Sequence, residues 1–322
     1  MSTHGFRHYL RVPVAQLDRA SACGAEGRRF KSCRAYHSVK PRKDPKWSFL
    51  LYNRTIMEKV KKVTNKTKTR VRKIKTKLLA SYYGNPIKDM KLICITGTTG
   101  KVEVAHFVHE ILRVAGQHVA CLAADEDIKA GTLHKFFSDA WKAGANYVVV
   151  TAPAKSLKRE VFHGLPVYIA ALTNYIPAGL TDASAEEYEA DESTLFDMHP
   201  NIVVLNRDDL HYSTFQNFAG TDATITYGSD AASTVQIESS KLYKKGAEAR
   251  FNISGNRLNV ATFLTGEPVI SYMACATAIA SALHLSHSDI ENGLAEYDPT
   301  SEPDQSENPA EPEQPEPSPD AS

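Results

Sequence analysis

Short apolar runs alternate with helical patterns of apolar residues between residues 91 and 206. The runs are rich in β-branched residues, and Tyr147–Thr151 is an example. Such runs are typical of parallel strands that are covered on both faces. The pattern therefore predicts a three-layer α/β fold with a mostly parallel sheet. The expected strands are Lys91–Thr96, His118–Ala123, Tyr147–Thr151, Val167–Thr173 and Ile202–Asn206, and the expected helices are Lys101–Ala115, Thr132–Ala143 and Ala185–Phe196.

The chain then changes to closely spaced strand patterns with turn residues between them. Ser254-Gly255-Asn256 fits the turn of a hairpin, so C-terminal antiparallel strands are expected. Two helical patterns follow, and Ser286 with Asp289 forms an approximate capping box at the start of the second. The expected strands are Ala223–Tyr227, Thr234–Glu238, Ala249–Ile253 and Leu258–Phe263, and the expected helices are Val269–Leu283 and Ser286–Leu294.

A third kind of pattern occupies residues 57–78. Apolar residues recur there at helical intervals, and Lys or Arg fills most of the other positions. This predicts a basic amphipathic helix that adheres to anionic lipid or to nucleic acid. The alternative is a solvated helix or a disordered leader. The apolar positions are Val60, Val63, Val71, Ile74 and Leu78.

The formal net charge of +1 is the sum of strongly unequal regions. Residues 1–56 hold 12 basic and 3 acidic side chains, and residues 57–78 hold 10 and 1. Residues 79–298 hold 16 and 26, whereas residues 299–322 hold no basic residue, 7 acidic residues and 7 prolines. We therefore expect a disordered segment 1–56, a basic helix and linker 57–87, a globular domain 88–298 and a disordered acidic tail 299–322.

The first segment has a further peculiarity at the level of its codons. Val14–Ala20 can be back-translated into a transfer-RNA D arm, Arg29–Ser32 into a T arm and Ala35–His37 into a terminal CCA. The order and spacing of these pieces resemble a translated tRNA gene. We therefore expect residues 1–56 to be a spurious extension and Met57 to be the start, with a genuine basic arm as the alternative.

The sequence contains no run of about 18 uncharged apolar residues, the length that a membrane-spanning helix needs. It also has no apolar run typical of a secretory signal near its beginning. A cytoplasmic protein is expected, with peripheral attachment to the inner membrane face through residues 57–78 as an open alternative. Five widely spaced cysteines indicate neither a disulfide framework nor a zinc site.

One motif carries recognisable chemistry. Ile95-Thr96-Gly97-Thr98-Thr99-Gly100-Lys101 follows an apolar strand and opens a helix. Backbone amides of such a loop can hold a polyphosphate, and Lys101 can reach its terminal phosphates. Val102 stands where nucleotide-binding loops carry the hydroxyl that binds Mg²⁺, so metal binding is doubtful.

This loop resembles that of the Mur ligases, ATP-dependent amide-forming enzymes of peptidoglycan synthesis, and the UDP-N-acetylmuramoyl-tripeptide synthetases in particular. The resemblance is collinear over residues 88–296 and implies the central ATPase domain of that family. Besides the loop, the segments that carry it are Ala170–Asn174, Glu186–Phe196, Val203–Asp209, Thr226–Gly228, Gly266 and Met273–Leu283.

The resemblance also implies roles for individual residues. ATP would be held by Gly97, Thr98, Thr99, Gly100, Lys101, Thr173, Asn174 and Asn206. Lys101 and Glu192 would be catalytic, with Glu192 standing near where the family has a carbamylated lysine. No metal ligand is expected, since Val102, Thr151, Lys155 and Ala178–Thr181 depart from the family's pattern. Tyr272 stands at the position of an adenine-side asparagine.

The family also has an N-terminal UDP-sugar domain and a C-terminal domain for the incoming amino acid, and neither is recognised in this sequence. The favoured interpretation is a Mur-ligase-family protein of peptidoglycan precursor synthesis with weak or no ligase activity. One alternative is an active ligase completed by partner chains, with a UDP-muramoyl peptide or other cell-wall enzymes as partners. The other is a non-catalytic scaffold near the membrane. No specific nucleic-acid partner is expected.

Overall fold

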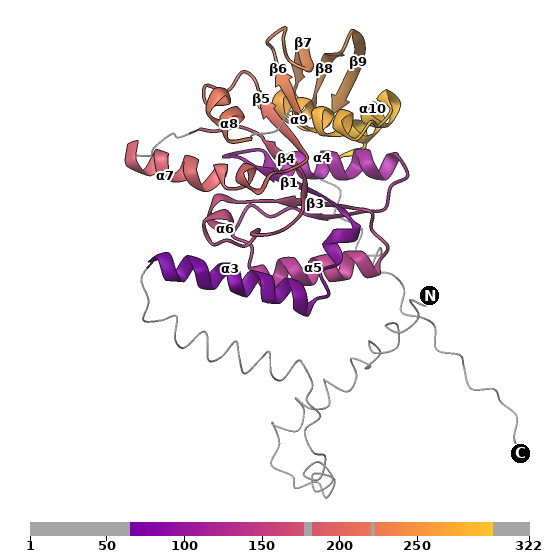
Figure 1. Ribbon diagram of the computed structural model, residues 1–322. Coiled ribbons are helices and arrows are strands. Elements are labelled where there is room, and N and C mark those ends of the chain that lie inside the picture. The colour runs from indigo at the N-terminus through magenta and orange to yellow at the C-terminus, as the bar shows by residue number, and fades with distance from the viewer. Residues whose placement is uncertain (1–64, 177–181, 220–222, 299–322) are drawn as a thin grey trace, which may run out of the picture. The chain divides into compact units, whose positions relative to one another are not determined.

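The computed structural model describes residues 65–176, 182–219 and 223–298. These residues form a nine-stranded sheet with the strand order β2-β3-β1-β4-β5-β6-β7-β8-β9 (Figure 1). Pairings from β2 to β7 are parallel, and those of β7 with β8 and β8 with β9 are antiparallel. The strands are β1 (Lys91–Thr96), β2 (Val119–Leu122), β3 (Tyr147–Thr151), β4 (Val167–Leu172), β5 (Ile202–Asn206), β6 (Thr224–Gly228), β7 (Val235–Tyr243), β8 (Gly246–Ile253) and β9 (Asn256–Thr262).

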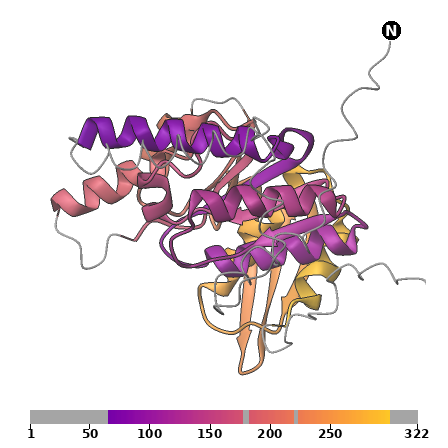
Figure 2. The ribbon, with the colours of Figure 1, turned by 90° about the horizontal axis from the view of Figure 1, so that it is seen from below.

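Helices cover both faces of this sheet (Figure 1). On one face, α4, α9 and α10 pack over the sheet, and on the other lie α5, α6 and α8. α3 lies beside α5 on the outside of that second layer (Figure 2). The helices are α3 (Asn65–Tyr82), η2 (Pro86–Asp89), α4 (Lys101–Val114), α5 (Ala130–Lys142), α6 (Ala154–Lys158), α7 (Asp182–Ser193), η3 (Phe196–Met198), α8 (Tyr212–Ala219), α9 (Val269–Ala282) and α10 (His287–Glu296).

Central strand β1 shows why the sequence forms three layers. Successive side chains of a strand point to opposite faces, and in β1 both sets are apolar. Leu92 and Cys94 belong to the core beneath α5, whereas Ile93 and Ile95 belong to the core beneath α4. All four are fully buried. The predicted three-layer α/β class and the C-terminal antiparallel strands are therefore confirmed.

Predicted element boundaries agree with the structure to within a few residues for most elements. The hairpin turn is present, with Ser254 and Gly255 at positive φ, and the Ser286 hydroxyl accepts a hydrogen bond from the Asp289 amide at 3.2 Å. α6 and α8 were not predicted, since they have only five and eight residues, which is shorter than the window in which a helical period stands out. β7 and β8 are longer than predicted, because the added part of β7 is exposed and polar and the added part of β8 begins with a glycine, Gly246.

Several predictions lie outside the described residues. These are the disordered and spurious segment 1–56, the first part of the basic helix, the stretch Ala178–Thr181 and the acidic tail 299–322. Within the described residues the basic helix begins at Asn65 and continues to Tyr82, beyond the predicted end at Leu78. None of the helices in this part of the chain is long and apolar enough to cross a membrane.

Strand β9 forms one of the two edges of the sheet, and α10 lies alongside it. The backbone amide of Asn259 in β9 donates a hydrogen bond to the Glu291 carboxylate of α10 at 3.2 Å. α10 also packs closely on α4 through Gly293, which lies against the backbone of Ile111. The C-terminal helix is therefore fixed both to the edge of the sheet and to the helix that follows the glycine-rich loop.

Candidate functional site

The glycine-rich loop joins β1 to α4, and two of its positions require glycine. Gly97 has a φ of 131°, and a Cβ atom there would lie 2.2 Å from the Thr173 hydroxyl oxygen. Gly100 has a φ of 79°, and a Cβ atom there would lie 2.1 Å from the Tyr272 ring. Both φ values lie in the region that glycine adopts without a steric penalty. The loop can therefore lie directly against the ends of β4 and α9.

Thr173 and Asn174, at the end of β4, hold this loop in place. The Thr173 hydroxyl donates to the Thr99 carbonyl oxygen at 2.6 Å, and the Thr98 amide donates to the Asn174 carbonyl oxygen at 3.0 Å. The Asn174 side chain accepts from the Thr99 amide at 3.0 Å and donates to the Thr99 hydroxyl at 2.9 Å. The structure thus brings these two predicted residues together with Gly97–Gly100.

Lys101 begins α4, and its side chain turns back over the loop. Its Nζ donates to the Gly97 carbonyl oxygen at 2.9 Å and to the Thr98 carbonyl oxygen at 3.3 Å. The residue is only 6% exposed. An Asp125 carboxylate oxygen lies 3.6 Å from Nζ, but that side chain is 81% exposed. Lys101 is thus a largely buried cation beside a glycine-rich loop, an arrangement that fits a bound phosphate. Asp125 follows β2 and was not predicted.

The two positions that the resemblance associates with magnesium do not offer metal ligands. Val102 is half-buried and has no ligand atom. Thr151 is fully buried, and its hydroxyl donates to the Ala124 carbonyl oxygen at 2.7 Å and accepts from the Ala124 amide at 2.8 Å. Its oxygen also lies 3.4 Å from the Leu122 carbonyl oxygen. Among the described residues, no group of three His, Cys, Asp or Glu side chains could hold a metal ion. These residues do not fit a magnesium site.

Glu192, in α7, lies buried behind the loop. One of its carboxylate oxygens lies in hydrogen-bond contact with the Thr96 hydroxyl, whose single proton is shared with the Ala152 carbonyl oxygen at 2.7 Å. The other oxygen, Oε1, has no hydrogen-bond partner. Burial raises the pKa of Glu192, and hydrogen bonds from Thr96 and Tyr188 and the charge of Lys101 offset part of that rise. Glu192 therefore supports the end of β1 from behind.

The raised pKa of Glu192 predicts a dependence of stability on pH. Folding favours the protonated carboxyl, so Glu192 costs stability increasingly as pH rises above the ordinary value of 4.5. Glu192→Gln keeps the shape of the side chain and cannot ionise. We expect thermal denaturation to show a higher melting temperature for Glu192→Gln than for the wild type at pH 8, with a smaller difference at pH 5. An equal difference at both values would contradict an ionisation effect. Glu189→Gln, at a half-buried position on the same helix, is the control.

Tyr272 and Asn206 lie at the other side of the loop. The Tyr272 ring lies on Gly100, and its hydroxyl donates to the Thr99 hydroxyl at 3.1 Å. Asn206 ends β5, and its side-chain nitrogen lies 3.5 Å from the hydroxyl of Ser271, the residue before Tyr272. Asn206 thus lies at the α9 side of the site, with no direct contact to the loop among the hydrogen bonds of the described residues.

Sequence reasoning missed the residues that tie the ends of the strands together. The Tyr227 hydroxyl, fully buried in β6, donates to the Thr173 carbonyl oxygen at 2.7 Å. The Asp209 carboxylate accepts from the Tyr175 amide at 2.7 Å and from the His211 amide at 2.8 Å. The pair Asp208-Asp209 after β5 is a local sequence signal for a structured strand end. The hydrogen bond from Tyr227 to Thr173, in contrast, joins two distant segments and cannot be predicted from a local pattern.

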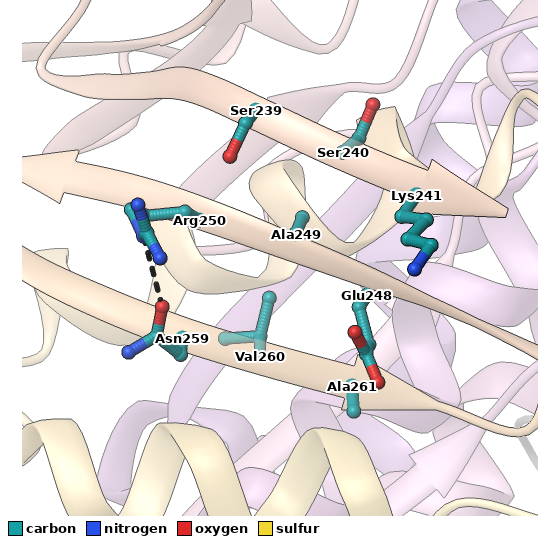
Figure 3. Close-up of a pocket in the computed structure, with 9 residues that line it drawn as sticks. All are labelled: Ser239, Ser240, Lys241, Glu248, Ala249, Arg250, Asn259, Val260 and Ala261. Atoms are coloured by element: carbon teal, nitrogen blue, oxygen red, sulfur yellow. Dashed lines mark hydrogen bonds between the residues drawn. The ribbon is translucent and has the colours of Figure 1, made fainter.

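A separate pocket of about 540 Å³ lies on the open side of the antiparallel strands (Figure 3). Figure 3 shows Arg250 directed toward Asn259, and their hydrogen bond measures 3.1 Å. All of the lining residues come from β7, β8 and β9, and none comes from the glycine-rich loop. The pocket is therefore not part of the candidate site. Its lining residues are Ser239, Ser240, Lys241, Glu248, Ala249, Arg250, Asn259, Val260 and Ala261.

Comparison with known proteins gives consistent results. Residues 95–280 match the Mur ligase middle domain. The chain is 29% identical over 236 residues to UDP-N-acetylmuramoyl-L-alanyl-D-glutamate–2,6-diaminopimelate ligase of Bacillus licheniformis, which covers 66% of this chain and 48% of that protein. It is 25% identical over 237 residues to UDP-N-acetylmuramyl-tripeptide synthetase of Roseiflexus sp., and this match covers 64% of this chain and 46% of that protein. The chain thus spans about half the length of these relatives.

Solved structures show the same fold. A UDP-N-acetylmuramoyl-L-alanyl-D-glutamate–2,6-diaminopimelate ligase superposes with a TM-score of 0.63 at 18% identity, covering 72% of this chain and 51% of that one. An FPGS complex with AMPPCP superposes with a TM-score of 0.55 at 13% identity, covering 72% of each chain. The match to the Mur ligase middle domain covers more than half of this chain, and the chain therefore belongs to the Mur ligase family.

Proposed function

We propose that this chain is a Mur-ligase-type domain that binds the phosphates of ATP weakly, with little dependence on Mg²⁺, and has weak or no ligase activity. The observation that carries the proposal is the contrast between the two halves of the site. The loop and Lys101 form a cradle for an anion, whereas Val102 and Thr151 supply no metal ligand.

Binding of a polyphosphate is supported by charge and geometry. The Lys101 ammonium is held over the loop by two carbonyl oxygens, and the nearby Asp125 carboxylate is mostly in solvent. A phosphate placed at the start of α4 would meet this ammonium and the N-terminal amides of the helix. Thr173 and Asn174 keep the loop in shape. The solved FPGS complex has a similar fold and contains AMPPCP, which supports an ATP-like ligand here.

Ligation requires more than binding. Phosphoryl transfer depends on neutralising the negative charge that develops on the transferred group, and metal ions supply much of that neutralisation. In this chain Lys101 is the cation placed to do so, and the Thr151 hydroxyl is already used to hold Ala124. We therefore propose that any turnover is slow.

Calorimetric titration with ATP tests the proposal. We expect weak binding of similar strength with Mg²⁺ and with a chelator. Lys101→Ala removes a charge-assisted hydrogen bond and should weaken binding by about tenfold to a hundredfold. Lys135→Ala, at an exposed lysine of α5, is the control and should bind as the wild type does. Tight binding that is lost with the chelator would show a working metal site and refute the proposal.

Phosphate release distinguishes this proposal from an active ligase completed by partner chains. The wild-type chain is incubated with ATP and Mg²⁺, with and without a UDP-muramoyl peptide acceptor. We expect slow release that the acceptor does not change. Release that the acceptor stimulates would overturn the proposal in favour of the active ligase.

A further inference from the structure

The orientation of α3 is fixed by contacts with the segment after α6. The Thr76 hydroxyl, which is 2% exposed, donates to the Glu160 carbonyl oxygen at 3.0 Å. The Lys73 ammonium lies 3.5 Å from the Glu160 carboxylate, and Arg72 lies 3.4 Å from the Lys158 carbonyl oxygen. These contacts turn the side of α3 that contains Thr76 toward the domain.

The opposite side of α3 consequently faces outward, and it contains the apolar stripe. At 100° per residue, Ile74 lies on the side opposite Thr76, with Val71 and Leu78 close to it. Ile74 is 48% exposed, and Val71 and Leu78 are half-buried. An amphipathic helix that packs on a domain normally buries this stripe. In α3 the polar Thr76 occupies the buried position and the stripe is turned outward.

Basic side chains flank the outward stripe. α3 contains seven Lys and Arg residues and no Asp or Glu. Arg70 and Lys77 are exposed on one flank of Ile74, and Lys75 and Lys68 lie on the other. In Figure 2 the helix lies on the outside of the domain, beside α5. The exposed face is therefore an apolar centre between two basic rows.

Basic side chains also line a pocket between α3 and the start of α5. Arg72, Lys75, Lys129 and Arg159 line a pocket of about 190 Å³ there. Arg159 is paired with the Asp127 carboxylate, so its charge is partly compensated. Lys129 and Arg72 are exposed. Because Thr76 lines the same pocket, these charges lie on the domain-facing side of α3 and are separate from its outward face.

We propose that the outward face of α3 binds the surface of an anionic lipid bilayer. The basic rows would meet anionic headgroups, and Ile74, Val71 and Leu78 would enter the boundary between headgroups and acyl chains. A nucleic acid would bind the basic side chains through its phosphates, but its backbone offers no apolar surface to the centre of the stripe. The combination of both features in α3 favours lipid. The proposal is independent of nucleotide binding at the glycine-rich loop.

Sedimentation of the full chain with vesicles tests this proposal. We expect binding to vesicles of phosphatidylglycerol mixed with phosphatidylcholine and none to phosphatidylcholine alone. Arg70→Gln with Lys77→Gln removes two charges and should weaken binding by about 30-fold, at the usual contribution of each basic residue near an anionic surface. Ile74→Asn should weaken it severalfold with the charge unchanged. Lys241→Gln with Lys245→Gln, at exposed positions in β7 and in the turn after it, should leave binding as in the wild type.

Each other outcome overturns the proposal. Absence of wild-type binding to the anionic vesicles would do so directly. Equal losses in the α3 and control pairs would show that only net charge matters. Full binding by Ile74→Asn, together with competition by duplex DNA, would show a general polyanion surface. Because all of these side chains are substantially exposed, unchanged melting curves would confirm that the variants remain folded.

Discussion

Replacing Gly293 with alanine is expected to destabilise the fold strongly. A Cβ atom at Gly293 would lie 2.4 Å from the Ile111 Cα atom and 2.7 Å from its backbone nitrogen. Backbone atoms of α4 cannot move aside as a flexible side chain can, so α10 must shift away from α4. Overpacking of this kind costs about 1–3 kcal/mol, and we expect the upper part of that range. The melting temperature should fall by about 4–10 °C for a domain of this size.

Gly131→Ala is the matched control for this substitution. Gly131 also lies in a helix, α5, and no heavy atom lies within 4 Å of a Cβ atom placed there. Alanine is favoured over glycine within helices, so Gly131→Ala should leave the melting temperature unchanged or raise it. A similar response of the two variants would contradict the close packing of α10 on α4.

Replacing Thr151 with glutamate is expected to have the second large effect. The substitution removes the hydroxyl that holds Ala124 and places a carboxylate at a fully buried position. An unpaired buried charge costs about 3 kcal/mol or more. We expect a large fall in the melting temperature at pH 8 and a smaller one at pH 5, where the carboxyl binds a proton more readily.

Two further variants show whether the loss of stability comes from the missing hydroxyl, from the buried charge or from a missing metal ion. Thr151→Ser keeps the hydroxyl and should remain close to the wild type in melting temperature. Val102→Thr combined with Thr151→Glu introduces both missing metal ligands, and we expect Mg²⁺ with ATP to restore little of the lost stability. Full recovery with Mg²⁺ and ATP would show that a metal site can be rebuilt by these two changes alone, contrary to the misfit described above.

Much of the fold could be predicted because its central strands carry local signals. β1, β3 and β5 were predicted to the residue, since each is a short apolar run between polar or glycine-containing segments. The outer end of β7 was missed because its side chains are exposed and polar, and the start of β8 was missed because it opens with Gly246 directly after a turn. There the strands are specified by pairing with each other, which is a property of two segments and of neither alone.

The orientation of α3 could not be predicted from the sequence pattern, for a different reason. Its apolar period predicted a helix correctly, but that period could not show which side faces the domain. A buried hydrogen bond from Thr76 to the Glu160 carbonyl oxygen, 84 residues away, decides the orientation. At the glycine-rich loop, likewise, the glycines and Lys101 were evident from the sequence, whereas the positions of Asp125 and Tyr227 depend on how distant strand ends meet.

The contact between α10 and the last strand has a consequence for the behaviour of the protein at high concentration. An exposed strand edge carries unpaired backbone groups onto which a strand of another molecule can add, and growth by such additions leads to aggregates. On β9, the backbone amide of Asn259 already donates a hydrogen bond to the Glu291 carboxylate. An incoming strand would have to displace that carboxylate and leave its charge without the hydrogen bond. Aggregation by extension of the sheet is therefore opposed at this edge by α10, and by Glu291 in particular.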